Sequence, residues 1–129
     1  MSGHELAIQH NDKGTIWVLM EGAEDVSAYA LVAIARNANE DEVINAQADA
    51  ATARPCIGMA LDAISDGYKG RIALFGFITN TAWSWTPGDT LYLTDTAGVI
   101  GTVGTVRQEV GGALSATTIL FNPKTIDTT

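Results

Sequence analysis

One cysteine and two histidines are the residues best suited to covalent chemistry. Cys56 is the only cysteine, and His4 and His10 are the only histidines. A catalytic thiol needs a base beside it, and both histidines stand near the N-terminus, where a chain is poorly ordered unless something ties it down. Cys56 is therefore predicted to be a small apolar residue in a buried strand. The histidines, six residues apart with no Cys-x-x-Cys pair, fit no metal-site spacing.

Paired or clustered carboxylates are the next candidates for chemistry. Asp62 and Asp66 could form an acid–base pair, but nothing in the sequence marks the cleft that would raise one pKa by burial. Asp66 precedes Gly67 and is explained as a turn residue. The run Glu40 to Glu42 is acidic throughout, whereas a calcium loop places its ligands at alternate positions and includes a turn glycine. We interpret this run as a solvated acidic loop.

Glycines at 98, 101 and 104 superficially resemble a phosphate-binding loop. The segment lacks the Gly-x-Gly start, a following helix and the lysine of a P-loop. The four serines also lack a Gly-x-Ser-x-Gly context. The sequence therefore predicts a protein that is not an enzyme, with no catalytic residue, no cofactor and no metal.

Composition limits the partners. The chain has 129 residues, about one domain, with 17% charged residues and a net charge of −8. Its seven basic residues are scattered, which argues against nucleic acid, because phosphate binding needs Lys and Arg gathered on one face. The longest apolar run is far short of the ~20 residues that span a membrane, and no secretory signal is visible. We expect synthesis in the cytoplasm and no membrane partner.

Strand patterns dominate the elements that would position any site. Apolar and β-branched runs predict strands at 16–20, 71–78, 91–93 and 117–121, separated by turns at 66–70 and 87–89. One segment, 45–53, has helix propensity, and Pro55 limits its length. We expect a mainly β fold, a single compact barrel or sandwich with at most one short helix. Residues 1–15 would be an N-terminal arm, 16–123 the β domain and 124–129 a flexible tail.

An internal echo suggests two related β units. Residues 57–64 (IGMALDAI) align with 110–117 (VGGALSAT), and each is followed by an apolar run that ends in Leu-Phe. Alternate residues of a strand point to one face, so the shared alanines would leave room for a neighbouring layer. We interpret the echo as two β units packed into one barrel or sandwich.

Two of the tryptophans, Trp83 and Trp85, have more than one possible role. Trp83 and Trp85 flank a serine and would share one face of a strand that ends at the Pro87-Gly88 turn. Core packing explains them, and so does a role as interface anchors, since tryptophan is enriched where binding energy concentrates. A sugar-binding platform is a third possibility.

The C-terminal half carries a family resemblance. Residues 76–98 (GFITNTAWSWTPGDTLYLTDTAG) and 108–123 (QEVGGALSATTILFNP) resemble small virion proteins of tailed bacteriophages, including head-decoration and fibre proteins. Residues 57–76 look like the core of capsid cement proteins with a β-tulip-like fold. The resemblance implies a homotrimer on the virion capsid surface that binds the major capsid protein and cements neighbouring subunits. A fibre component that contacts a host glycan or protein is the alternative, and a cell-wall hydrolase is a third class.

Partner contacts are predicted from exposed-looking side chains. In the N-terminal arm, which could add a strand to an exposed sheet edge, the candidates are His4, Leu6 and Ile8. In the β domain they are the aromatic residues Tyr68, Trp83 and Trp85.

Overall fold

The computed structural model describes residues 9–10, 14–37, 39 and 41–126. Within these residues the chain is almost entirely β, with ten strands and one three-residue 3₁₀ helix, η1 (Ala51–Ala53). The predicted fold class is confirmed. The predicted arm lies largely outside the described residues, except that β1 (Gln9–His10) pairs with the start of the next strand.

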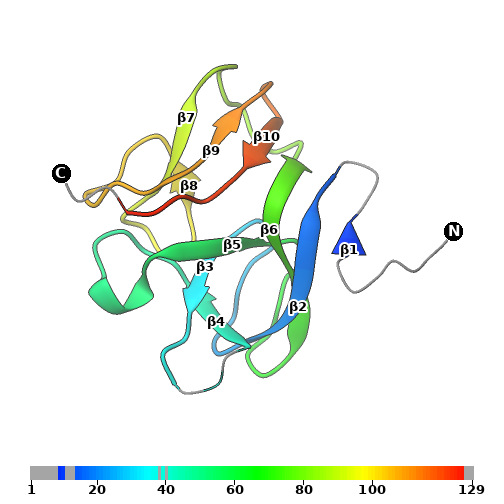
Figure 1. Ribbon diagram of the computed structural model, residues 1–129, viewed down its shortest axis with the longest axis vertical. Coiled ribbons are helices and arrows are strands. Elements are labelled where there is room, and N and C mark those ends of the chain that lie inside the picture. Colours follow the sequence, from blue (N-terminus) through cyan, green and yellow to red (C-terminus); the bar gives the residue numbers. More distant parts are fainter. Residues whose placement is uncertain (1–8, 11–13, 38, 40, 127–129) are drawn as a thin grey trace, which may run out of the picture.

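Five strands close a small barrel, seen in the lower part of Figure 1. Their order around the ring is β2 (Ile16–Gly22), β4 (Glu42–Asn45), β3 (Leu31–Ile34), β5 (Cys56–Ala60) and β6 (Lys69–Thr79). Strand β2 pairs with β6 along one edge and closes the ring by a short parallel pairing with β4. That closure has only two residue pairs, Glu21 with Glu42 and Gly22 with Val43.

A second sheet grows from the far half of β6. Strand β6 pairs with β10 (Thr118–Phe121), which is followed by β9 (Glu109–Ala113), β7 (Thr90–Leu93) and β8 (Ile100–Gly101). Figure 1 shows β6 leaving the barrel and continuing beside β10. One eleven-residue strand therefore belongs to both halves of the molecule.

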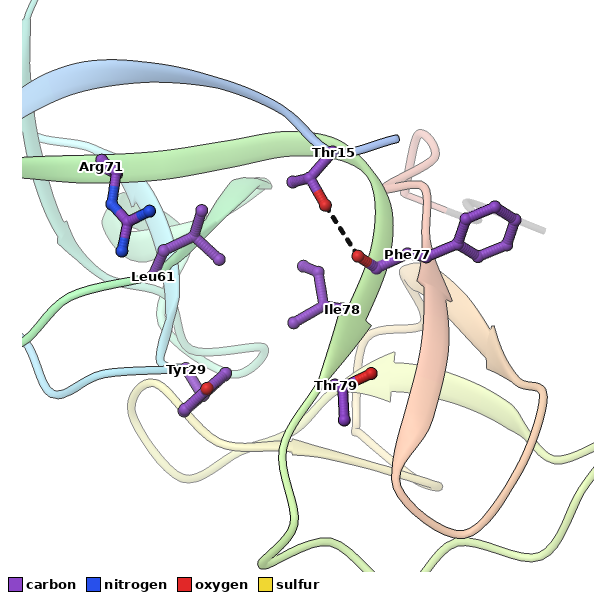
Figure 2. Close-up of a pocket in the computed structure, with 7 residues that line it drawn as sticks. All are labelled: Thr15, Tyr29, Leu61, Arg71, Phe77, Ile78 and Thr79. Atoms are coloured by element: carbon purple, nitrogen blue, oxygen red, sulfur yellow. Dashed lines mark hydrogen bonds between the residues drawn. The ribbon is translucent and has the colours of Figure 1, made fainter. Parts of the chain in front are cut away.

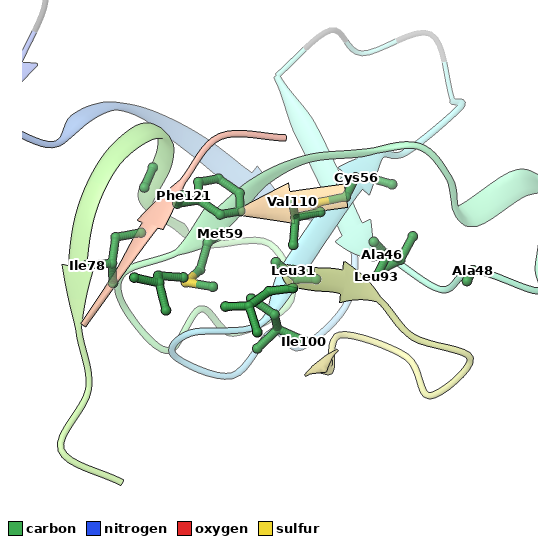
Figure 3. Close-up of a cluster of buried hydrophobic side chains, with 14 residues drawn as sticks. Leu31, Ala46, Ala48, Cys56, Met59, Ile78, Leu93, Ile100, Val110 and Phe121 are labelled. Atoms are coloured by element: carbon green, nitrogen blue, oxygen red, sulfur yellow. The ribbon is translucent and has the colours of Figure 1, made fainter. Parts of the chain in front are cut away.

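Several strands have continuous apolar sequences because apolar side chains pack on both of their faces. In β3, Val32 points into the barrel, while Leu31 and Ala33 point to the space between the barrel and the second sheet. Strand β6 alternates in the same way at Ile72 and Ala73. Figure 3 shows the larger cluster, with Leu31 and Met59 from the barrel beside Val110 and Phe121 from the second sheet. A strand buried on both faces needs no polar alternation.

Gly76 marks the point where β6 passes from one sheet to the other. Its φ is +133°, a conformation that residues with a side chain rarely adopt. A Cβ there would lie 2.5 Å from the carbonyl oxygen of Gly14 and 2.6 Å from the Cα of Thr15. Strand β6 can therefore bend at this position only because Gly76 has no side chain.

The helix predicted at 45–53 is wrong for most of its length. Asn45 ends β4, and the chain passes through a turn at Ala48 and Asp49 before η1. Their backbone groups bond to other segments: the Ala46 N–H donates to the Leu31 carbonyl, and the Ala48 N–H donates to the Thr94 carbonyl. Burial of both alanines in the larger core cluster outweighs the helix propensity of the alanine-rich sequence.

The echoed segments occupy matching places in two hairpins. The first echo includes most of β5, which returns through a loop into β6, and the second includes most of β9, which returns through a turn into β10. Ala60 pairs with Ile72 in the first hairpin, and Ala113 pairs with Ile119 in the second. The prediction of two β units packed together agrees with this arrangement.

Candidate binding surfaces

Trp83 and Trp85 lie in the loop between β6 and β7, not on a strand as predicted. Backbone bonds fix the loop: the Trp83 N–H donates to the Asn80 carbonyl at 3.0 Å, and the Trp85 N–H donates to the Ala116 carbonyl at 2.9 Å. The Trp-Ser-Trp alternation is typical of a strand, but Trp83 bonds within its own loop and Trp85 bonds to the β9–β10 turn, so neither bond belongs to a strand ladder.

The two rings are half-buried and belong to an aromatic cluster. Trp83 meets the ring of Tyr29 edge to face, with centroids 5.6 Å apart, and lies 5.9 Å from the ring of Trp85. All three rings pack against the larger core cluster. Core packing therefore accounts for part of each ring, and the remaining part faces a groove.

That groove has a volume of about 470 Å³ and is built from four separate segments. Tyr29 comes from the loop before β3, Asn45 from the end of β4, Trp83 from the β6–β7 loop and Gly98 from the β7–β8 turn. The structure thus brings together Trp83 and Trp85, which the sequence singled out, with Tyr29 and two asparagines, which it did not. No pattern in the sequence connects residues so far apart.

The other predicted contact residues do not gather at this groove. Tyr68 stands in the loop between β5 and β6 with 70% of its surface exposed, while its backbone carbonyl accepts the Gly22 N–H. His4, Leu6 and Ile8 lie outside the described residues.

Strands β2 and β6 expose large apolar side chains whose exposure the sequence does not predict. Leu19 is 58% exposed, and Phe75 and Phe77 are 41% and 43% exposed. Val18 is also exposed. Because consecutive strand residues point to opposite sides, the run 16–20, predicted as a strand, carries an exposed apolar side chain on each side. A run of five apolar residues cannot reveal which of its faces another layer covers.

A smaller pocket of about 260 Å³ lies where the barrel meets the second sheet. Figure 2 shows Arg71, Leu61 and Tyr29 on one side, with Ile78 and Thr79 on the other. The guanidinium of Arg71 is already engaged by Asp62 at 2.7 Å and stacks over Trp17 at 5.7 Å. Its charge is therefore satisfied within the protein.

The pairing with Arg71 has a pH signature. Hydrogen bonds from the Arg71 side chain hold the pKa of Asp62 below its ordinary value. A lowered pKa in the folded state stabilises the fold above the unfolded carboxyl's pKa, and the contribution disappears as pH falls through the lowered value. We expect Asp62→Asn to lower the free energy of unfolding by at most about 1 kcal/mol at neutral pH, because the pair is partly exposed.

Urea unfolding from neutral to acid pH measures this effect. The difference between wild type and Asp62→Asn should shrink as the pH drops below the ordinary range of aspartate. Asp66→Asn, at an exposed loop carboxylate, is the control and should show a smaller effect. A difference that stays constant down to low pH would show that Asp62 acts through packing rather than charge.

Cys56 is buried in the larger core cluster, as predicted, and its Sγ donates to the Gly58 carbonyl at 3.3 Å. Burial raises the pKa of its thiol to about 12. We expect a chromogenic disulfide reagent at pH 8 to react slowly with the native protein and quickly in denaturant, because only the thiolate attacks. Prompt labelling of the native protein would contradict this burial.

The segment after β7 that contains Gly98, Gly101 and Gly104 forms a loop whose ends are joined by hydrogen bonds. Thr105 donates hydrogen bonds to the carboxylate of Asp95 through both its backbone N–H and its hydroxyl, and these bonds lower the pKa of Asp95. Within the described part of the chain, no three Asp, Glu, His or Cys side chains are placed to hold a metal ion. The described residues also contain no helix that is long and apolar enough to cross a membrane.

Comparison with known proteins gives one match. The family model for phage cement proteins matches residues 8–119, which include all of the barrel strands and nearly all of the second sheet. Comparison with curated proteins and with solved structures found no match. Since the matched region is most of the chain and agrees with the resemblance seen in the sequence, this protein belongs to the phage cement protein family.

Proposed function

We propose that this protein binds the outer surface of a phage capsid and cements neighbouring major capsid subunits. The observation that carries the proposal is the family match over residues 8–119. The acidic surface, with a net charge of −8, fits a protein that stays soluble until a specific partner overcomes its charge repulsion.

The exposed apolar side chains of β2 and β6 are the surface that we assign to the capsid. Leu19 and Phe75 lie in the segments of β2 and β6 that pair with each other, and Phe77 lies two residues further along β6, where that strand pairs with β10. Burying one such side chain against a partner contributes roughly 1.5–3 kcal/mol. A few of them would anchor one subunit only weakly, which suits a protein present in many copies.

We propose that the working unit is a homotrimer. Once one subunit of a trimer is bound, the others meet their sites at a high effective concentration, so weak contacts combine into tight occupancy. Binding to the expanded shell but not to its precursor would stabilise the shell by linkage. Residues 1–15 would act as an arm that reaches the capsid or a neighbouring copy.

The test adds purified protein to capsids that lack it and measures copies per particle by densitometry and electron microscopy. Leu19→Ser should reduce occupancy at limiting protein concentration, whereas Leu114→Ser, at a 53% exposed leucine of the β9–β10 turn, should not. Circular dichroism of each variant must show that the fold is intact. Equal occupancy by both variants would remove the assignment of this surface.

Two further readouts separate the parts of the proposal. Deleting residues 2–13 should lower occupancy, and full occupancy by the deletion variant would refute the arm. Mass photometry of the free protein reports whether the trimer forms before binding. Antibody labels confined to the tail tip of phage particles would overturn cementing in favour of the fibre alternative.

A further inference from the structure

The groove described above is lined by Tyr29, Trp83, Trp85, Asn45 and Asn80, among others, and we call it the aromatic groove. It has the dimensions of a small-molecule site. Its volume of about 470 Å³ falls in the ordinary range for ligand pockets. Its walls combine aromatic rings with a few polar side chains, which is the composition typical of such sites. It lies apart from the exposed apolar residues of β2 and β6, none of which lines it.

The rings are presented at fixed angles. Tyr29 and Trp83 are inclined by 68°, and Trp83 and Trp85 by 49°. The backbone of Tyr29 has a φ of +67°, a left-handed conformation that is a genuine outlier for a bulky residue. Its N–H donates to the Ala60 carbonyl at 2.6 Å, which holds the residue in place. Such strain, kept by surrounding bonds, is characteristic of binding sites.

The polar side chains of the groove leave particular atoms unengaged. Asn45 donates its amide hydrogens to Glu24 and to the Asp25 carbonyl, so its Oδ1 is the atom left to accept. Asn80 does the reverse: its Oδ1 accepts the Ala82 N–H, so its amide hydrogens are left to donate. A ligand in the groove therefore meets an acceptor and a donor whose orientations are already fixed.

Trp85 adds a third unengaged group. Its indole Nε1 is buried and has no hydrogen-bond partner among the described residues. An unpaired buried donor costs free energy, and each one in a native structure calls for an explanation. Because Nε1 is itself buried, a ligand oxygen could bond it only if the side chain of Trp85 shifted toward the groove.

The charge of the groove narrows the ligand class. None of the side chains that line it is charged. The protein's net charge of −8 disfavours anionic ligands such as phosphates or acidic sugars. Aromatic faces offer apolar contact, and the asparagines offer one acceptor and one donor. A ring with C–H faces and neutral hydroxyl groups satisfies all of these requirements.

We propose that this groove binds a neutral saccharide, with the aromatic rings against the sugar ring and Asn45 and Asn80 bonding its hydroxyls. The site is independent of capsid attachment and would give a decorated particle an affinity for neutral glycans. Because one shallow groove binds a short sugar weakly, we expect dissociation constants in the millimolar range.

The experiment titrates ¹⁵N-labelled free protein with neutral sugars and follows amide and indole N–H resonances. The probes are glucose, galactose, mannose, N-acetylglucosamine and their disaccharides, with sialic acid as the anionic comparison. Expected are shifts of the Trp83 and Trp85 indole signals with a neutral sugar and none with sialic acid. If no neutral sugar shifts these signals at millimolar concentration, the proposal is overturned.

Two variants locate the site. Asn80→Asp keeps the oxygen that accepts the Ala82 N–H but loses the amide donor and adds a charge, and it should weaken binding at least tenfold. Trp83→Ala should do the same, with its spectrum checked for an intact fold. Tyr68→Ala, an exposed aromatic outside the groove, should leave binding unchanged. Binding unaffected by Asn80→Asp, or groove signals that shift with protein concentration alone, would overturn the proposal, the latter in favour of a second copy.

Discussion

Replacing Gly76 by alanine is expected to destabilise the protein by about 3 kcal/mol or more, or to prevent folding. Two costs combine at this position. The φ of +133° is strained for any residue with a side chain, and the new methyl group would collide with backbone atoms of Gly14 and Thr15 rather than with a movable side chain. Because this backbone is part of two sheets, moving it to relieve the collision would itself cost free energy. Urea unfolding followed by circular dichroism measures the loss.

Gly67→Ala is the matched control for that prediction. Gly67 also has a positive φ, +86°, but a Cβ there would meet nothing within 4 Å. The control therefore carries the conformational cost without the collision and should lose only about 1 kcal/mol. If the two variants were equally stable, the junction in β6 would not be as crowded as the structure indicates.

Gln108→Leu is expected to cost about 3 kcal/mol, because it leaves buried backbone groups without partners. The Gln108 side chain is 1% exposed. Its Oε1 accepts the Cys56 N–H at 2.7 Å, and its Nε2 donates to the carbonyls of Cys56 and Lys124, each at 2.8 Å. One amide thus joins the start of β5 to the C-terminal segment. Leucine fills a similar volume and makes none of these bonds.

Gln47→Leu is the comparison for Gln108→Leu. The Gln47 amide makes one exposed side-chain bond, to Asp49, and its loss should change the free energy of unfolding by less than about 0.5 kcal/mol. Amide hydrogen exchange adds a local readout, since the Cys56 N–H should lose protection in Gln108→Leu. Unchanged protection would mean that another group replaces the glutamine.

The sequence predicted strands well where local pattern and turn chemistry agree. The apolar run 71–78, the Pro87-Gly88 turn and the strand around Leu91 all lie where expected. The helix at 45–53 failed because burial of Ala46 and Ala48 between sheets decided the backbone conformation. Closure of the barrel was not predictable either, since it depends on two residue pairs between distant strands.

The features of the candidate sites were also predictable from the sequence only in part. Residue type alone pointed to Trp83 and Trp85, but their loop conformation and their contact with Tyr29 depend on tertiary structure. The structural role of Gln108 could not be predicted from its residue type, because a glutamine is ordinarily a surface residue. The exposure of Leu19 was also hidden, because an apolar side chain in a strand is expected to face a core. Such features depend on which layer covers which face.

The shared strand β6 has a mechanical consequence, because it belongs to both halves of the molecule. Part of any force applied between the barrel and the second sheet runs along the continuous backbone of β6, through the bend at Gly76. The two halves are not joined by a flexible linker, as two domains would be. Separating them shears the ladders of β6 and also breaks bonds between the halves, such as that from the Ala48 N–H to the Thr94 carbonyl. Hydrogen bonds sheared together resist load jointly, so the protein should yield in a single rupture rather than stretch in stages.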